Sequence, residues 1–277
     1  MHRILFVGSD PALLAELRRL QEVPDFEVEV AAGGVDAVRR VRRRRIDLVV
    51  TSPGSSIEED LALIAELREA RPGLREIILA PSATPEDVIA VLRANVFACF
   101  TAPFDWPEIA SIIRVSLSEH DWRRSIELLS ATPGWISLRV SSQLPTAERV
   151  VQFMRELAGD QPGDRRDDLI FAFREMLLNA MEHGAGFDPD KVIDVSAVRT
   201  DRAIVYHFRD PGPGFRPTRL PQAAASSTFQ DVEASVVFRE EAGLRPGGFG
   251  MLLVRNLVDE VIYNESGNQV ILVKYTR

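Results

Sequence analysis

The sequence has little cysteine, little lysine and no long apolar run, and the first and last of these exclude certain kinds of protein. A single cysteine, Cys99, stands among 277 residues, so neither an intrachain disulfide nor a cysteine zinc cluster can form. No apolar run approaches the ~20 residues that a membrane helix needs, and the apolar stretch at the N-terminus is too short for a signal peptide. Lysine occurs only as Lys191 and Lys274, so nearly all basic charge is arginine. We therefore expect a cytoplasmic protein without a membrane partner.

The composition that remains is typical of a folded, acidic protein. Hydrophobic residues make up 45% of the chain and charged residues 27%, which excludes a mostly disordered protein. The formal net charge is −8, and an acidic surface argues against direct binding to nucleic acid. The length of 277 residues favours two domains, because a domain has roughly 100–200 residues.

Short apolar strands alternate with amphipathic helices over the first 120 residues. The alternation predicts five strand–helix pairs, with strands at 3–7, 26–31, 47–51, 77–80 and 97–101. Apolar strands separated by helices form a parallel sheet that is covered on both faces. We therefore predict an α/β, doubly wound (βα)5 domain at residues 1–120. A helical linker is predicted at 121–134, where Pro133 and Gly134 end the helix.

The (βα)5 pattern resembles response-regulator receiver domains but lacks their reactive residues. In receivers, an aspartate that accepts the phosphoryl group follows the third strand, a hydroxyl residue follows the fourth and a lysine follows the fifth. Ser52, Ala80 and Ala102 stand at these positions here. Without the nucleophile and its lysine we expect no aspartyl phosphorylation. The resemblance implies a pseudo-receiver that docks a regulator or pairs two chains.

Residues 135–277 mix helices with antiparallel strands, which is typical of an α/β sandwich. A first motif lies on the predicted helix 164–184. Glu175 and Asn179 are four residues apart there, so they share one helix face. A carboxylate and an amide on one face can hold a divalent cation and polarise a nucleophile beside it.

Two further motifs are rich in glycine. Asp210 directly follows a predicted strand, where its carboxylate can accept a hydrogen bond from an exocyclic amine, and Gly212 and Gly214 let the backbone approach a flat ring. Gly248 and Gly250 belong to a turn that opens a helix, and such a turn presents free N–H groups to a phosphate.

In order and spacing, the runs E-x-x-x-N-A-x-x-H-G, D-x-G-x-G-F and G-G-x-G-x-x-L resemble the N, G1 and G2 boxes of the GHKL ATPase superfamily. Over residues 135–277 the resemblance is closest to the bacterial anti-sigma-factor serine kinases. It implies a sandwich that binds ATP and Mg²⁺ under a flexible lid at residues 215–246.

The resemblance also implies roles for the residues of the first two boxes. Asn179 would coordinate the Mg²⁺ that bridges the phosphates, and Glu175 would be the general base that activates the attacking hydroxyl. Asp210 would recognise the amine of adenine.

The glycines and one arginine would complete the site. Gly212 and Gly214 would shape the base pocket, and Gly248 and Gly250 would donate N–H groups to the phosphates. Arg245, just before the G2 glycines, would reach the γ-phosphate from the lid.

The function implied is an ATP-dependent protein serine/threonine kinase of a partner-switching pathway. Its substrate would be a serine on a small antagonist protein of the anti-anti-sigma type, with a sigma factor as a further partner and a homodimer as the assembly. Two alternatives stay open: a non-catalytic module that sequesters a partner in an ATP-dependent way, and a divergent histidine-kinase catalytic core. Glu175 favours the kinase, because binding alone needs no base. The stretch around His120, SEHDWRR, does not resemble a phosphoacceptor-histidine motif.

Overall fold

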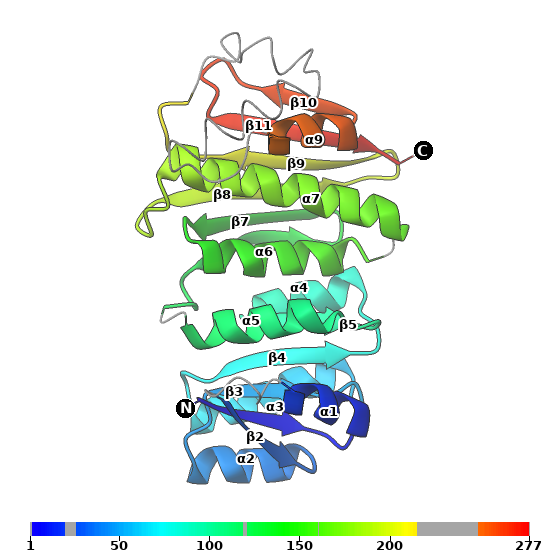
Figure 1. Cartoon of the computed structure of the whole chain (residues 1–277), viewed down its shortest axis with the longest axis vertical. Helices are drawn as coiled ribbons and strands as arrows, with labels where there is room; N and C mark the ends of the chain where they lie inside the picture. The colour runs from blue at the N-terminus through cyan, green and yellow to red at the C-terminus, as the bar shows by residue number, and fades with distance from the viewer. Residues whose placement is uncertain (1, 20–25, 119–120, 160, 215–248, 277) are drawn as a thin grey trace. The chain divides into compact units, whose positions relative to one another are not determined.

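The computed structural model describes residues 2–19, 26–118, 121–159, 161–214 and 249–276 (Figure 1). The chain divides into two compact units. Unit 1 is Met1–Ser125 with Glu148–Gly159, and unit 2 is Ile126–Ala147 with Asp160–Arg277. Among the described helices, none is long and apolar enough to cross a membrane.

Unit 1 contains five parallel strands in the order β2-β1-β3-β4-β5, the doubly wound order of flavodoxin-like and receiver folds. This confirms the predicted (βα)5 domain. Its elements in chain order are β1 (His2–Val7), α1 (Pro11–Arg19), β2 (Phe26–Ala31), α2 (Gly34–Arg43), β3 (Leu48–Thr51), α3 (Ile57–Ala70), β4 (Arg75–Ala80), α4 (Pro85–Arg93), β5 (Ala98–Thr101) and α5 (Trp106–Ser118).

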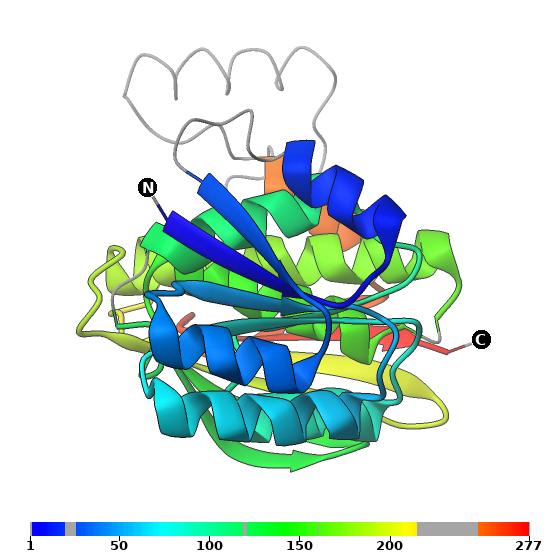
Figure 2. The same ribbon diagram turned by 90° about the horizontal axis from the view of Figure 1, so that it is seen from below.

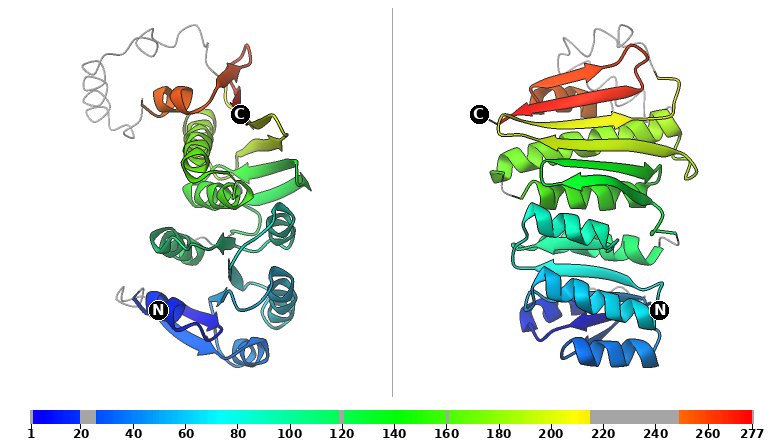
Figure 3. Two further views of the ribbon diagram at one scale, coloured as in Figure 1. Left: turned by 90° about the vertical axis from the view of Figure 1, so that its right-hand side faces the viewer. Right: turned by 180° about the vertical axis from the view of Figure 1, so that it is seen from behind.

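Helices cover both faces of this sheet, with α1 and α2 on opposite sides (Figures 2 and 3). The reason lies in the alternation along β1, because successive side chains of a strand point to opposite faces. Ile4 and Phe6 join the cluster that includes Leu17 of α1. Leu5 joins the cluster that includes Val38 of α2.

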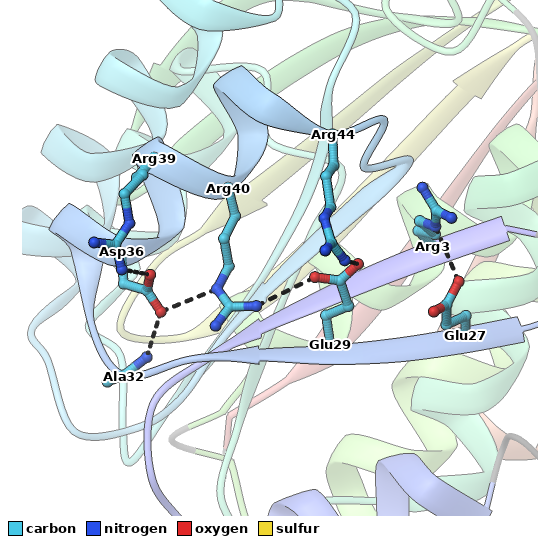
Figure 4. A network of polar contacts seen from close by, with 8 residues as sticks. All are labelled: Arg3, Glu27, Glu29, Ala32, Asp36, Arg39, Arg40 and Arg44. Carbon is cyan, nitrogen blue, oxygen red and sulfur yellow. Dashed lines mark hydrogen bonds and ion pairs between the residues drawn. The ribbon is translucent and has the colours of Figure 1, made fainter.

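The arginine-rich end of α2 is paired with acids of its own unit (Figure 4). Glu29 of β2 accepts hydrogen bonds from Arg40 Nη1 at 3.3 Å and Arg44 Nη1 at 3.2 Å. Asp36 binds Arg39 and Arg40, and these hydrogen bonds lower the pKa of its carboxyl. Much of the positive charge of these arginines is therefore compensated by acidic residues of the same unit.

Unit 2 contains a six-stranded sheet in the order β10-β11-β9-β8-β7-β6, with every neighbouring pair antiparallel. Helices α7 and α9 lie on one face of it (Figure 3). On that face the ring of Phe173 lies 5.0 Å from the rings of Tyr206 and Phe208. The elements are β6 (Ile126–Thr132), β7 (Trp135–Ser141), α6 (Leu144–Leu157), α7 (Gly163–Asn179), the π-helical turn η2 (Ala180–Ala185), β8 (Val192–Arg199), β9 (Ala203–Arg209), α9 (Phe249–Leu257), β10 (Glu260–Tyr263) and β11 (Gln269–Tyr275).

The predicted helical linker at 121–134 is wrong. Its residues 126–132 form β6, which pairs antiparallel with β7 through a tight turn at Pro133 and Gly134. The consecutive apolar residues Leu128 and Leu129 fit a helix as well as a strand, and a register shift at this point leaves Leu129 exposed. Pairing with β7 decides between the two, because it provides backbone partners that an isolated segment lacks.

Candidate functional site

Ser52, Ala80 and Ala102 lie where neighbouring strands of unit 1 end, as predicted. The amide of Ser52 donates to Val7 O at 3.0 Å, and that of Ala102 donates to Ala80 O at 3.2 Å. Ser52 is only 7% exposed. Gly8, at φ 143°, packs so closely that an added Cβ would lie 2.0 Å from Ser52 Oγ. The place where a receiver carries its nucleophile thus holds a packed serine.

A buried carboxyl, Asp60 of α3, lies beside this position. It accepts hydrogen bonds from Thr51 Oγ1 at 2.8 Å and Ser55 Oγ at 2.6 Å. Burial raises its pKa, against the opposing effect of these two bonds. Within the described ranges, no group of three or more His, Cys, Asp or Glu residues could hold a metal ion. Through its bonds to Thr51 and Ser55, Asp60 fastens α3 to the end of β3.

In unit 2, Glu175 and Asn179 lie near the end of α7, on a face that is only partly buried. The side chain of Glu175 is 21% exposed, and its Oε1 lies 3.6 Å from Arg174 Nη1. Gly250, in the first turn of α9, approaches so closely that an added Cβ would lie 2.1 Å from Glu175 Oε2. The structure therefore brings the first and third motifs together, although 75 residues separate Glu175 from Gly250.

Asp210 follows β9 and is anchored from two sides. Its amide donates to Asn268 O at 3.0 Å, and its Oδ1 accepts the amide hydrogen of Gly212 at 2.8 Å. Burial raises the pKa of the carboxyl, while the bond from Gly212 acts in the opposite direction. The result is a carboxylate whose position is set by backbone bonds on both sides.

Gly184 joins the first motif to the second. An added Cβ at Gly184 would lie 2.3 Å from Asp210 Oδ1, and one at Gly212 would lie 2.6 Å from Gly184 O. The π-helical turn η2 carries Gly184 to this position after α7 ends, and such turns occur frequently at functional sites. Gly186, at φ 70°, then terminates the turn.

Gly214 packs against the turn between β10 and β11. It has φ 72°, and an added Cβ would lie 1.9 Å from Ser266 O. Asn264 stabilises that turn by donating to Ser266 Oγ at 2.7 Å and Asn268 Oδ1 at 2.9 Å. Gly184 and Gly212 pack against Asp210 itself, and Gly214 packs against the turn that is bonded to Asp210, so side chains would not fit at these three positions. We call these three glycines the cradle of Asp210.

Sequence reasoning named Gly212, Gly214 and Asp210 but not the role of Gly184 or Asn268. Gly184 ends the first motif, so a signal for it was present in the sequence. Asn268 has no local signal, because its contact with Asp210 joins residues 58 positions apart. The predicted site residues Arg245 and Gly248, and the predicted lid at 215–246, lie outside the described residues.

Comparison with known proteins gives a domain assignment for unit 2. Residues 140–274 match the family model of the histidine kinase-like ATPase domain. The chain is 27% identical over 268 residues to the transcriptional regulatory protein GlrR of Escherichia coli strain K12, an alignment that covers 94% of this chain and 56% of GlrR. It is 25% identical over 115 residues to the transcriptional regulatory protein PrrA of Mycobacterium tuberculosis, which covers 42% of this chain and 49% of PrrA. The chain thus spans about half the length of these curated relatives.

Similar solved structures cover the first part of the chain. A response regulator from Thermotoga maritima has a TM-score of 0.40 at 22% identity, over 43% of this chain and 99% of that one. A CheY-like receiver domain from Methanospirillum hungatei has a TM-score of 0.38 at 24% identity, over 42% of this chain and 94% of that one.

Proposed function

Residues 140–274 form a histidine kinase-like ATPase domain, and on that premise we propose that the protein is an ATP-dependent serine/threonine protein kinase. Its substrate is a serine of a small antagonist protein of the anti-anti-sigma type, and a sigma factor is a further partner. The receiver-like unit docks a regulator or pairs two copies of the chain. These assignments place the protein in the cytoplasm, in a regulatory pathway controlled by ATP.

The cradle around Asp210 supports binding of ATP. Two of its glycines, Gly184 and Gly212, pack against a half-buried carboxylate that can accept a hydrogen bond from the amine of adenine. Because these positions carry no Cβ, the backbone packs closely here and holds the carboxylate of Asp210 in one place. Asn179 supplies an amide oxygen, a ligand type that Mg²⁺ accepts alongside phosphate oxygens. Bound Mg²⁺ would neutralise phosphate charge, while the chain's own groups position the nucleotide.

The contact of Glu175 with Gly250 is the observation that carries the kinase assignment. Gly250 lies in the first turn of α9, where unpaired N–H groups and the helix dipole favour a phosphate. A carboxylate held against that turn is close to the place where a phosphoryl group would be transferred. There it can take the proton of an attacking hydroxyl, and the rest of the reaction needs mainly positioning and charge neutralisation.

The test is incubation of the full chain and labelled ATP with candidate antagonist proteins from the same genome. Glu175→Ala should leave nucleotide affinity nearly intact and abolish transfer, because a general base contributes about 10²–10⁴-fold to the rate. Asn179→Ala should weaken both, because it removes a metal ligand that acts before and during transfer. Asp164→Ala is the control: this exposed acid is on the same helix, about 16 Å from Glu175 along the axis.

One outcome would replace the kinase assignment, and a second would remove only the role given to Glu175. Wild-type protein that transfers nothing, yet binds an antagonist only when ATP is present, would be an ATP-dependent sequestering module. Transfer by Glu175→Ala at the wild-type rate would remove Glu175 from the role of base.

A further inference from the structure

The end of helix α2 in unit 1 is unusually rich in arginine. It carries Arg39, Arg40, Arg42, Arg43, Arg44 and Arg45, and we call these six residues the α2 arginine surface. The side chains that α2 buries are Ala37, Val38 and Val41. Arg39, Arg42 and Arg43 are exposed instead, and because positions three and four apart share a helix face, they lie on one side of α2. The solvent-facing side of this helix end is therefore built of guanidinium groups.

Three acids of unit 1 brace part of this surface from below. The ion pairs are Glu29 with Arg40 and Arg44, Asp36 with Arg39 and Arg40, and Asp47 with Arg45. Figure 4 shows the pairs of Glu29 and Asp36. The side chains of the three acids are between 8% and 16% exposed, whereas those of Arg39, Arg44 and Arg45 are between 59% and 78% exposed. A partner that approaches this surface thus meets guanidinium groups, because the carboxylates lie below them.

Arg42 and Arg43 have no such brace. Both are exposed, and within the described residues neither side chain takes part in a hydrogen bond or an ion pair. The carbonyl end of a helix favours cations, so the last turn of α2 stabilises their charge while it leaves their N–H donors free. Six arginines against three acids give the surface a formal charge of +3, on a chain whose formal net charge is −8.

The chemistry of this surface fits carboxylates. A guanidinium group can bind a carboxylate through two parallel hydrogen bonds. The braced arginines are already held in place by their acids, so less side-chain freedom is lost when a partner binds. Arg42 and Arg43 supply the unused donors. An acidic segment of another protein, with two or three neighbouring Asp or Glu residues, would satisfy them.

The acids below the surface argue against nucleic acid as the partner. Binding to a phosphodiester chain draws its affinity from many cations, each of which neutralises a phosphate and releases a counterion. Of the six arginines, only Arg42 and Arg43 lack an acidic partner within the described residues. A short acidic segment can use two such residues, whereas a duplex would place further phosphates over arginines whose charge is already compensated.

We propose that the α2 arginine surface is the site at which unit 1 binds an acidic segment of a partner protein, with Arg42 and Arg43 as the main contacts. The proposal goes beyond the kinase function, because it concerns unit 1 alone and needs no nucleotide. It gives a receiver-like unit that lacks phosphorylation chemistry a way to bind a regulator through charge.

The experiment measures binding of a fluorescein-labelled oligoglutamate peptide to the full chain by fluorescence anisotropy. Wild type should bind, and its affinity should fall as salt rises, because exposed charges are screened beyond about 10 Å at about 0.1 M salt. The double substitution Arg42→Gln and Arg43→Gln should weaken binding about tenfold, because an exposed ion pair contributes up to about fivefold. Thermal unfolding checks that the variant is folded.

The matched control is the double substitution Arg114→Gln and Arg124→Gln. It removes the same charge from two other exposed arginines of unit 1, and it should change the affinity by less than about twofold.

Four results would overturn the proposal. The first two are no binding by wild type, and equal affinity in the variant that lacks Arg42 and Arg43. The third is an equal loss in the control, because general attraction between opposite charges would then suffice. Tighter binding of duplex DNA than of oligoglutamate would assign the surface to nucleic acid instead. A wild-type dimer in sedimentation that the Arg42→Gln and Arg43→Gln protein no longer forms would assign it to a second copy of this chain.

Discussion

Replacing Gly184 with alanine tests whether Asp210 binds the base of the nucleotide. The added Cβ would lie 2.2 Å from Asp210 Cγ and 2.3 Å from Oδ1. It would also lie 2.4 Å from Asp210 Cβ, which rotation of the side chain does not move, so the backbone of Asp210 must shift from its bond to Asn268 and the carboxylate must move with it. This displacement breaks the bond from Gly212 and withdraws the acceptor from the adenine amine. A hydrogen bond to a charged group contributes about 1.5–3 kcal/mol, so we expect ATP affinity to fall about 10- to 150-fold.

Titration calorimetry with Mg-ATP measures the loss, and thermal unfolding checks that the variant is folded. Gly163→Ala is the matched control, because it adds the same methyl group to unit 2 where nothing lies within 4 Å. It should bind ATP like wild type. If Gly184→Ala does not fold, Asp210→Asn keeps the size of the side chain and removes its charge. Wild-type affinity in folded Gly184→Ala or in Asp210→Asn would refute the role of Asp210.

Three further predictions concern unit 1. Buried Arg149 donates from Nε to Phe97 O at 3.2 Å and from Nη1 to Trp122 O at 2.8 Å. Arg149→Met should lower the free energy of unfolding by about 3 kcal/mol or more, because bonds from a charged donor contribute about 1.5–3 kcal/mol each; denaturant titration measures this, and exposed Arg114→Met should change it little. Burial raises the pKa of Asp60, so its proton stabilises the fold at low pH and this contribution is lost as the pH rises through the folded pKa. Asp60→Asn should therefore gain stability relative to wild type between about pH 3 and 7, and a gap that stays constant with pH would contradict the assignment. Acetyl phosphate with Mg²⁺ should add no phosphoryl mass to unit 1, and an adduct at Ser52 would show that the packed serine is reactive.

Much of the fold could be predicted from the sequence because its signals are local. Apolar strands followed by amphipathic helices predict a (βα)5 domain, since side-chain periodicity depends only on neighbouring residues. The prediction of a helix at residues 126–132 was wrong because the local signal there is ambiguous. Leu128 and Leu129 suit either structure, and only pairing with β7 settles which one forms.

Part of the candidate site could also be predicted, because some of its signals are local. The spacing of Glu175 and Asn179 places them on one helix face wherever that helix lies. The glycines beside Asp210 indicate that another part of the chain packs closely against this backbone, but they do not identify which part. The neighbour, Gly184, lies 26 residues earlier, and the π-helical turn that brings it there has no signal in the hydrophobic pattern.

The sequence by itself determined which chemical groups stand at strand ends and helix starts, including the loss of receiver chemistry at Ser52, Ala80 and Ala102. Only the tertiary structure decided which of those groups meet. It brought Gly250 to Glu175, and within unit 1 it brought Gln152 to Cys99, which are 53 residues apart. The physical reason is that periodicity and spacing act over a few residues of chain. A contact between distant residues depends on how every intervening element packs.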